Sequence, residues 1–170
     1  MPLYFAYGAN MDIEDMAKRA PRSKPLGIAR LPRHRFIIMA EGYASVVRDP
    51  RTAVFGMLWD LALTDLRPLD KFEGVDRGLY TKINQPVVVE GGAKRALVYI
   101  AASAEPGKPR PGYLESILAA AREMGLPPAY LKELAGWSAT PIAGPVAGVT
   151  PRAGRPGTSE RATDKWSWDG

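Results

Sequence analysis

The sequence predicts an α+β fold, in which a largely antiparallel or mixed sheet is curved or closed into a small barrel and is flanked by helices. Two observations lead to this class. Six or seven strand-like runs lie before residue 103, and most of them follow one another without a helix-length crossover. The most regular helical patterns, at 112–124 and from 127 to about 136, come late in the chain.

The first element is an apolar strand over residues 2–6, which ends in the turn Tyr7-Gly8-Ala9-Asn10. A helix is expected over 11–20, before Pro21, and the side chain of Asn10 suits its N-cap. Backbone N–H groups at the start of a helix have no intrahelical partner, so they can hold a carboxylate or a developing oxyanion. The turn is therefore a candidate anion-binding loop.

The next region predicts further strands. Loose alternation over 25–40 indicates one or two strands, and 44–47 is a short strand closed by Asp49-Pro50. An apolar run over 53–61 predicts a longer strand. Gly56 inside this run indicates a bulge or a close approach of another backbone segment.

A helix is expected over 65–73, with Thr64 as a candidate cap and Gly74 as the residue that ends it. A hairpin joined by two glycines follows, with strands at 79–90 and 94–102. These elements and the two late helices make one domain, which we place at residues 1–137.

Residues 138–170 form a tail rich in Pro, Gly, Ala and Arg. Such a segment does not bury enough apolar surface to fold alone. Two alternatives stay open for it: a mobile tail, or a segment anchored on the domain or on a partner by Trp166 and Trp168.

Composition excludes several classes of function. The chain has no cysteine and one histidine, His34, so thiol nucleophiles and thiolate metal sites are absent, and a zinc site or a Ser-His-Asp triad is not favoured. We expect no metal and no cofactor. No apolar run approaches the ~20 residues that span a bilayer, and no signal peptide is recognisable. We therefore expect a cytoplasmic protein, monomeric or homodimeric, with no membrane partner.

The net charge of +5 leaves nucleic-acid binding as a further hypothesis, with basic residues gathered at 30–35. No helical basic stripe and no aromatic RNA-binding motif accompanies them, so nucleic acid is not the expected partner. A mildly positive surface equally favours a small acidic substrate.

Glu73 is the strongest candidate for acid/base chemistry. It ends a mostly apolar helix face beside Phe72 and Val75. Desolvation disfavours ionisation of a carboxylic acid, and this suits such a group to exchange protons at neutral pH. The alternative is an exposed residue at a helix end. The nearby Asp70 and Asp76 are expected to be solvated or paired with Lys71 and Arg77.

Four motifs in one order resemble the γ-glutamylcyclotransferase family, including its AIG2-like and γ-glutamylamine cyclotransferase-related members. The first is the loop Tyr4-Phe5-Ala6-Tyr7-Gly8-Ala9-Asn10, and the second joins Leu69-Asp70 to Glu73-Gly74-Val75 and Gly78-Leu79-Tyr80. The other two are the strand Val54–Trp59 and the helical end from Pro111-Gly112-Tyr113 to Ala129-Tyr130. The likeness covers roughly residues 3–136.

The resemblance implies a small mixed β-barrel of about six or seven strands, flanked by helices. It also implies a reaction in which the α-amine of a small γ-glutamyl substrate attacks its own γ-carbonyl and releases 5-oxoproline. Glu73 matches the catalytic glutamate of the family. The substrate-binding residues would be Tyr7, Gly8, Ala9 and Asn10, with Tyr80 and Tyr113 near the site.

The chemistry of the residues agrees with this reaction, because the nucleophile belongs to the substrate. An α-amine has a pKa of about 7.7–8.0 and must lose a proton before it attacks. Ala9 stands where the family commonly has serine, so the backbone N–H is kept and a hydroxyl is lost. A second hypothesis is therefore a non-catalytic module that binds a small carboxylate or a partner protein on the same fold.

Overall fold

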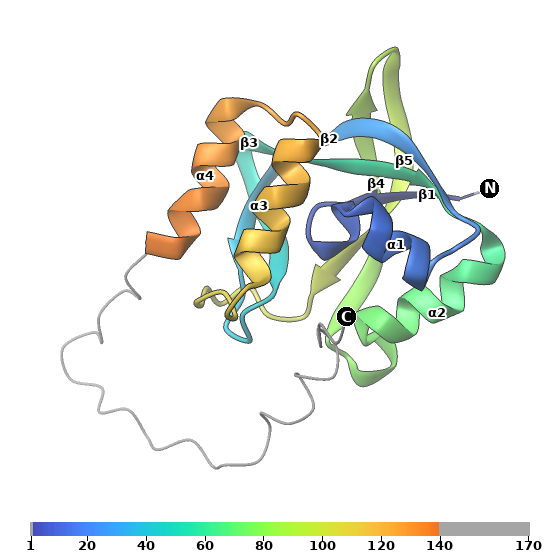
Figure 1. Cartoon of the computed structure of the whole chain (residues 1–170), viewed down its shortest axis with the longest axis horizontal. Helices are drawn as coiled ribbons and strands as arrows, with labels where there is room; N and C mark the ends of the chain where they lie inside the picture. The colour runs from blue at the N-terminus through green and yellow to red at the C-terminus, as the bar shows by residue number, and fades with distance from the viewer. Residues whose placement is uncertain (1, 140–170) are drawn as a thin grey trace.

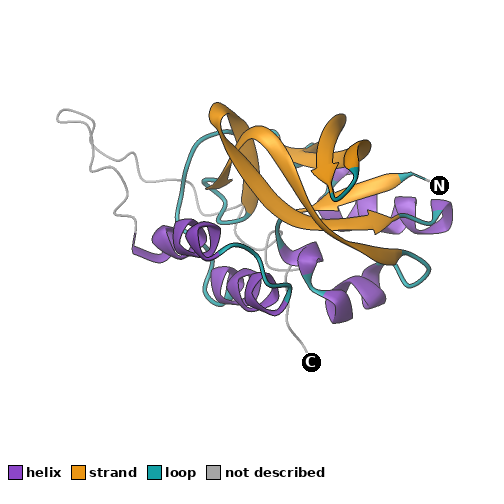
Figure 2. Cartoon of the chain, turned by 90° about the horizontal axis from the view of Figure 1, so that it is seen from above, coloured by secondary structure: helices purple, strands orange, loops and turns teal. Residues whose placement is uncertain are grey.

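The computed structural model describes residues 2–139, and its centre is a closed barrel of five strands (Figures 1 and 2). Around the barrel the strand order is β1-β3-β2-β4-β5. Neighbouring strands are antiparallel except β1 and β5, which are parallel and close the barrel at Tyr4 and Leu97. The bounds are Leu3–Ala6 for β1, Lys24–Ile38 for β2, Ala44–Asp60 for β3, Tyr80–Val89 for β4 and Gly92–Ala101 for β5.

The mixed barrel is confirmed, but the expected count of six or seven strands is wrong. Residues 44–47 and 53–61 belong to one strand, β3. The register with β2 shifts between Pro32 and His34, so Pro50 lies in an irregular stretch opposite this shift, where its missing N–H does not interrupt the ladder. Proline therefore bends the strand here instead of ending it.

Within residues 2–139, four α-helices and two short 3₁₀ turns flank the barrel. The helices α1 and α2 contact each other, and so do α3 and α4 (Figure 1). Their bounds are Ile13–Arg19 for α1, Leu63–Glu73 for α2, Tyr113–Glu123 for α3 and Pro128–Ala139 for α4. The 3₁₀ turns are η1, Ala9–Met11, and η2, Val75–Arg77.

Two expected caps are wrong. The cap of α1 is Asp12, whose side chain accepts a hydrogen bond from the Asp15 N–H at 2.9 Å, because the η1 turn separates Asn10 from the helix. Helix α2 begins at Leu63, before Thr64, and its N-cap is Ala62. Ala62 has no side-chain group that could cap the helix. Its own N–H donates a hydrogen bond to the hydroxyl oxygen of Ser23 at 3.1 Å.

Helix α4 is described to Ala139 and so includes Ser138, the first residue of the predicted tail. The remainder of the predicted tail, with Trp166 and Trp168, lies outside the described residues. Within the described part of the chain, no helix is long and apolar enough to cross a bilayer.

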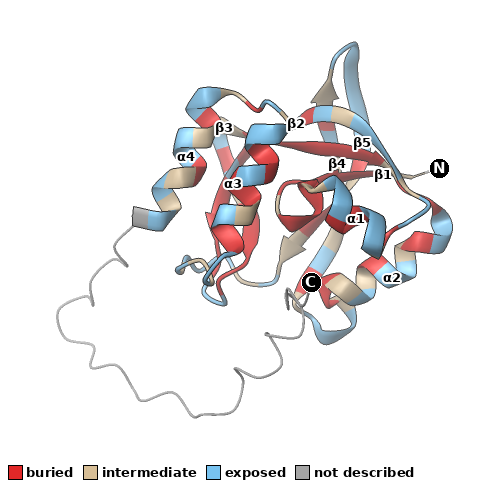
Figure 3. Cartoon of the chain, in the orientation of Figure 1, coloured by how far each residue is buried: buried red, intermediate tan, exposed pale blue. Residues whose placement is uncertain are grey.

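Buried residues lie on the barrel strands and on the helices that flank them (Figure 3), and their side chains form one hydrophobic core. Gly56 is where β3 crosses β1: a side chain added there would collide with the carbonyl group of Ala6. This confirms the close approach that the sequence indicates. Three positions further on, the buried Trp59 donates a hydrogen bond from Nε1 to the Asn10 carbonyl at 3.1 Å. The β1–β3 contact thus fixes the loop that follows β1.

Candidate functional site

The loop after β1 enters the η1 turn directly. Within this turn Met11 donates to the Gly8 carbonyl at 3.0 Å and Asp12 to the Ala9 carbonyl at 3.3 Å. The N–H groups of Ala9 and Asn10 precede these donors and have no bond within the turn. The expected arrangement, with backbone N–H groups presented at the start of a helical turn, is therefore present, although the turn is 3₁₀ and not α.

Glu73 reaches this loop from the far end of α2. It is the last residue of the helix, and Gly74 ends the helix in the left-handed conformation with φ 68°, as expected. Asn10 Nδ2 donates to Glu73 Oε1 at 2.9 Å. Glu73 is only 6% exposed, so the alternative of an exposed residue at a helix end is wrong.

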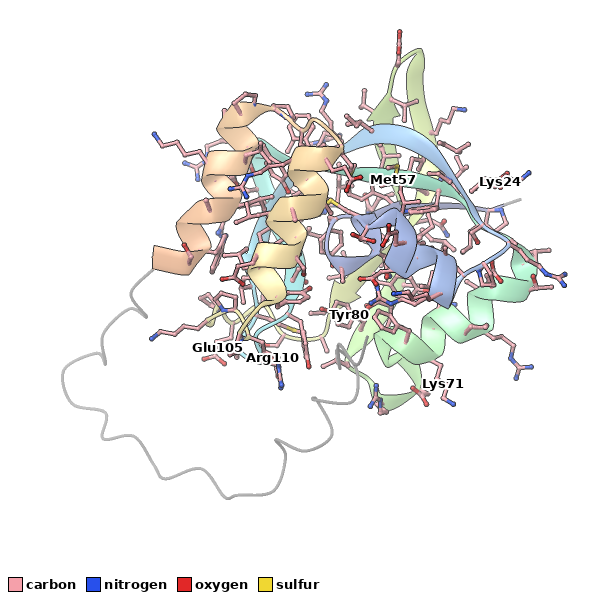
Figure 4. All side chains as sticks on the ribbon, in the orientation of Figure 1. Lys24, Met57, Lys71, Tyr80, Glu105 and Arg110 are labelled. Atoms are coloured by element: carbon pink, nitrogen blue, oxygen red, sulfur yellow. The ribbon has the colours of Figure 1, made fainter. Side chains whose placement is uncertain are left out.

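The loop and Glu73 line one pocket, which encloses about 280 Å³ of empty space including its mouth. All seven residues that the sequence nominates lie on its walls: Tyr7, Gly8, Ala9, Asn10, Glu73, Tyr80 and Tyr113. Tyr80, labelled in Figure 4, comes from the start of β4, and Tyr113 opens α3. Sequence reasoning missed three wall residues, which are Tyr4, Ala44 and Tyr99.

The hydroxyl groups of the pocket tyrosines are tied to backbone groups and to Asn10. Tyr7 donates to the Tyr99 carbonyl and Tyr80 to the Ala44 carbonyl, each at 2.5 Å. Tyr113 accepts from the Ala44 N–H at 3.0 Å, and Tyr4 accepts from Asn10 Nδ2 at 3.0 Å. Tyr80 and Tyr113 are therefore core tyrosines with bonded hydroxyls, and both also line the pocket.

Burial raises the pKa of these tyrosines well above its ordinary value, and the negative charge of Glu73 adds to the shift. For Tyr113, too, burial is the main cause of a raised pKa, with Glu73 contributing and a bond from the Ala44 backbone opposing it. The hydroxyls thus stay neutral around neutral pH. Glu73 is the ionisable carboxyl group among the residues that line the pocket.

Arg19 supplies a positive charge beside this site. Its Nη1 donates to Asn10 Oδ1 at 2.8 Å, on the opposite side of the amide from Glu73. Burial lowers the pKa of Arg19, and the carboxylates of Asp15 and Glu73 oppose that shift. Arginine stays protonated in such surroundings, so a cation contacts the oxygen end of the Asn10 amide while the nitrogen end contacts Glu73.

Asp70 is not paired with Lys71, in contrast to the expectation. It accepts from Lys82 Nζ at 2.7 Å and from the Tyr99 hydroxyl at 2.6 Å, because β4 and β5 pass beside α2. The carboxylate thereby holds one tyrosine of the pocket wall. Asp76 is exposed, as expected. No group of three or more potential metal-binding side chains occurs among the described residues.

Gly8 sets the width of the pocket. A Cβ atom at this position would lie 3.3 Å from Ala44 Cβ and 3.3 Å from the Tyr113 hydroxyl, which is a tight contact on both sides. Ala9, the next residue, is buried and also lines the pocket. The serine that the resemblance leads one to expect there would therefore place its hydroxyl at or near the pocket surface.

Comparison with known proteins shows which family the chain resembles. The model of the AIG2-like family matches residues 53–134, a range that includes Glu73. The human gamma-glutamylcyclotransferase is 30% identical over 143 residues, which cover 78% of this chain and 76% of the relative. The bovine gamma-glutamylcyclotransferase is 32% identical with the same coverage.

Solved structures agree with the sequence matches. A structure of a gamma-glutamyl cyclotransferase superposes with a TM-score of 0.73 at 26% identity, and the alignment covers 96% of both chains. A structure of an uncharacterized human protein gives a TM-score of 0.72 at 28% identity over 95% of both chains. The fold, the order of the motifs and these relatives lead to one conclusion: the chain belongs to the γ-glutamylcyclotransferase family.

Proposed function

We propose that this protein is a cyclotransferase that releases 5-oxoproline from a small γ-glutamyl amine or amide, with Glu73 as general acid and base. The observation that carries the proposal is the contact between Asn10 and Glu73. It brings a buried carboxylate to a loop with outward backbone N–H groups, inside a pocket whose other polar side chains are neutral. The relatives named gamma-glutamylcyclotransferase support the same class of reaction.

The proposed reaction needs one proton carrier and no other reactant. Glu73 as carboxylate takes a proton from the substrate α-ammonium group, and the resulting amine attacks the γ-carbonyl carbon. The new C–N bond closes a five-membered ring, and the bond from the γ-carbon to the leaving nitrogen breaks. The proton on Glu73 passes to the leaving nitrogen, and Glu73 then takes the second proton that the attacking nitrogen loses as it becomes the lactam N–H. This second proton passes to the departing amine, so that 5-oxoproline and a protonated amine are released and the carboxylate is restored.

The walls of the pocket fit the substrate's glutamyl portion. These walls carry neutral hydroxyl and amide groups beside the Glu73 carboxylate, which suits a folded glutamyl group with the leaving amine toward the mouth. In this proposal the N–H groups of Ala9 and Asn10, which have no bond within the turn, hold the γ-carbonyl oxygen or the α-carboxylate. Holding the chain folded lowers the orientational part of the barrier to ring closure.

The test is a panel of γ-glutamyl amino acids, γ-glutamyl amines and carrier-linked γ-glutamyl groups, with 5-oxoproline measured by liquid chromatography. At least one member should be turned over. Glu73→Gln should lose about 10²-fold or more in kcat, because the amide cannot carry the proton. Glu115→Gln, at an exposed position on α3, is the matched control and should keep full activity.

Unchanged release of 5-oxoproline by Glu73→Gln would refute the role of Glu73. The second hypothesis, a non-catalytic module on the same fold, requires a different result. Calorimetry would then detect binding of 5-oxoproline or a γ-glutamyl ligand, while no panel member is turned over.

A further inference from the structure

We infer that Arg19 is a positioning residue of this site: it fixes the orientation of the Asn10 amide so that Asn10 donates a hydrogen bond to Glu73. The inference rests on the proposed function for its catalytic consequence, but the geometry on which it is built does not. Arg19 is not part of any motif in the sequence; it lies nine residues after Asn10, at the end of α1.

The two ends of the Asn10 side chain differ in their hydrogen-bonding character. A carboxamide has one acceptor end and one donor end, and a half-turn about χ2 exchanges them. A guanidinium group has donors only, so the amide atom that faces Arg19 Nη1 at 2.8 Å has to be the oxygen. The NH₂ group is then directed to Tyr4 and to Glu73 Oε1, at 3.0 and 2.9 Å.

Tyr4 does not by itself fix the orientation of the Asn10 amide. A hydroxyl group can donate or accept, so it is compatible with either orientation of Asn10. Glu73 favours the donor end while it is ionised, but protonation during the reaction gives it an O–H that can donate to the amide oxygen. Among these three contacts of Asn10, Arg19 alone demands the same orientation in both protonation states of Glu73.

The Arg19 guanidinium group is itself held in place by contacts with Asp15 and Phe72. Its Nη2 lies 3.6 Å from Asp15 Oδ2, and its Cζ lies 4.2 Å from the centre of the Phe72 ring. Asp15 belongs to α1, whereas Phe72 directly precedes Glu73 in α2. The guanidinium group therefore touches both segments that meet at the Asn10–Glu73 contact, where α1 and α2 lie side by side in Figure 1. Its side chain is only 17% exposed.

The test is a double-mutant cycle on kcat with Arg19→Met and Asn10→Ala. Methionine keeps the apolar reach over Phe72 and removes every donor. If Arg19 acts through Asn10, Arg19→Met should lower kcat by about tenfold in the wild-type background and by less than about twofold in Asn10→Ala, with KM changed little in either. Equal losses in the two backgrounds would overturn the inference, because they indicate a merely structural role.

Two control variants test whether the effect of Arg19→Met comes from the loss of the hydrogen-bond donor at this position. Arg19→Lys keeps a positive charge near Asp15 and a donor for Asn10, so it should retain more of kcat than Arg19→Met, and an equal loss would contradict the inference. Arg22→Met removes an exposed arginine three residues away. It should change neither kcat nor the orientation of the Asn10 side chain. Thermal unfolding of each variant identifies any that does not fold.

A spectroscopic readout decides the inference even if no substrate is found. The chain contains two asparagines and one glutamine, which are Asn10, Asn84 and Gln85, so an NH₂-selected ¹⁵N NMR spectrum is simple. Asn10→Ala identifies the Asn10 signal. Glu73→Gln should shift that signal when Arg19 is present and should shift it less in Arg19→Met. An equal shift in both backgrounds would refute the positioning role, whereas an inactive wild type would refute only the proposed function.

Discussion

The two backbone groups of Ala44 are both held by tyrosine hydroxyls at the pocket wall, and this makes Tyr113→Phe an informative perturbation. Ala44 and Tyr113 are each 2% exposed. The substitution removes the acceptor of the Ala44 N–H and leaves that donor buried without a partner. The expected cost is about 1–3 kcal/mol of the free energy of unfolding. For a domain of this size, that corresponds to a decrease in Tm of about 3–10 °C.

The assay is thermal and urea unfolding of Tyr113→Phe beside Tyr130→Phe. Tyr130 is also buried, but its hydroxyl makes no hydrogen bond of ordinary geometry to the described residues. Its loss should therefore be neutral or slightly stabilising, within about 0.5 kcal/mol. Equal effects of the two variants would refute the reasoning, since both remove one buried hydroxyl and only one of them leaves a donor without its acceptor.

Four further predictions concern the loop, the strand crossing and the tyrosines. Gly8→Ala should raise KM by about tenfold in steady-state assays, because its Cβ presses on Ala44 and Tyr113 across the pocket. Ala9→Ser should lower KM by about two- to tenfold if its hydroxyl bonds the substrate, as one added hydrogen bond allows, and an unchanged KM would show that it does not. Gly56→Ala should reduce stability by more than about 3 kcal/mol in urea unfolding, because its Cβ collides with backbone and not with a movable side chain. Stability should fall above pH about 10, since buried tyrosines with raised pKa stay protonated when folded and ionise when unfolded; the urea midpoint between pH 8 and 11 measures this.

Short motifs were sufficient to predict the site residues whose signal is local. Gly8 and Gly74 stand where a strand and a helix end. Gly74 adopts the left-handed conformation with φ 68°, whereas a side chain at Gly8 would press on those of Ala44 and Tyr113. Glu73 could be nominated because it follows an apolar helix face and precedes Gly74. The resemblance then joined the two segments, which local patterns alone do not place together.

The remaining parts of the site depend on pairing between distant segments. Tyr99 reaches the pocket because β5 closes the barrel against β1 at Tyr4 and Leu97, and no residue near Tyr99 signals that closure. Ala44 has no functional group in its side chain, so only the tertiary structure reveals that its backbone binds two tyrosines. The predicted number of strands was too high for a related reason. Pro50 lies opposite a register shift and does not end β3, so two predicted strands are one.

The contact between Asn10 and Glu73 limits where this chain can gain or lose residues. Only Tyr7 to Asp12 separate β1 from α1, and Trp59 holds the middle of that segment. One inserted residue would rotate and move Asn10 away from Glu73. The β4–β5 hairpin, by contrast, projects from the barrel with an exposed tip (Figure 1). Added length is tolerated at such tips, so we expect an insertion there to disturb the fold and the site less than one in the loop after β1.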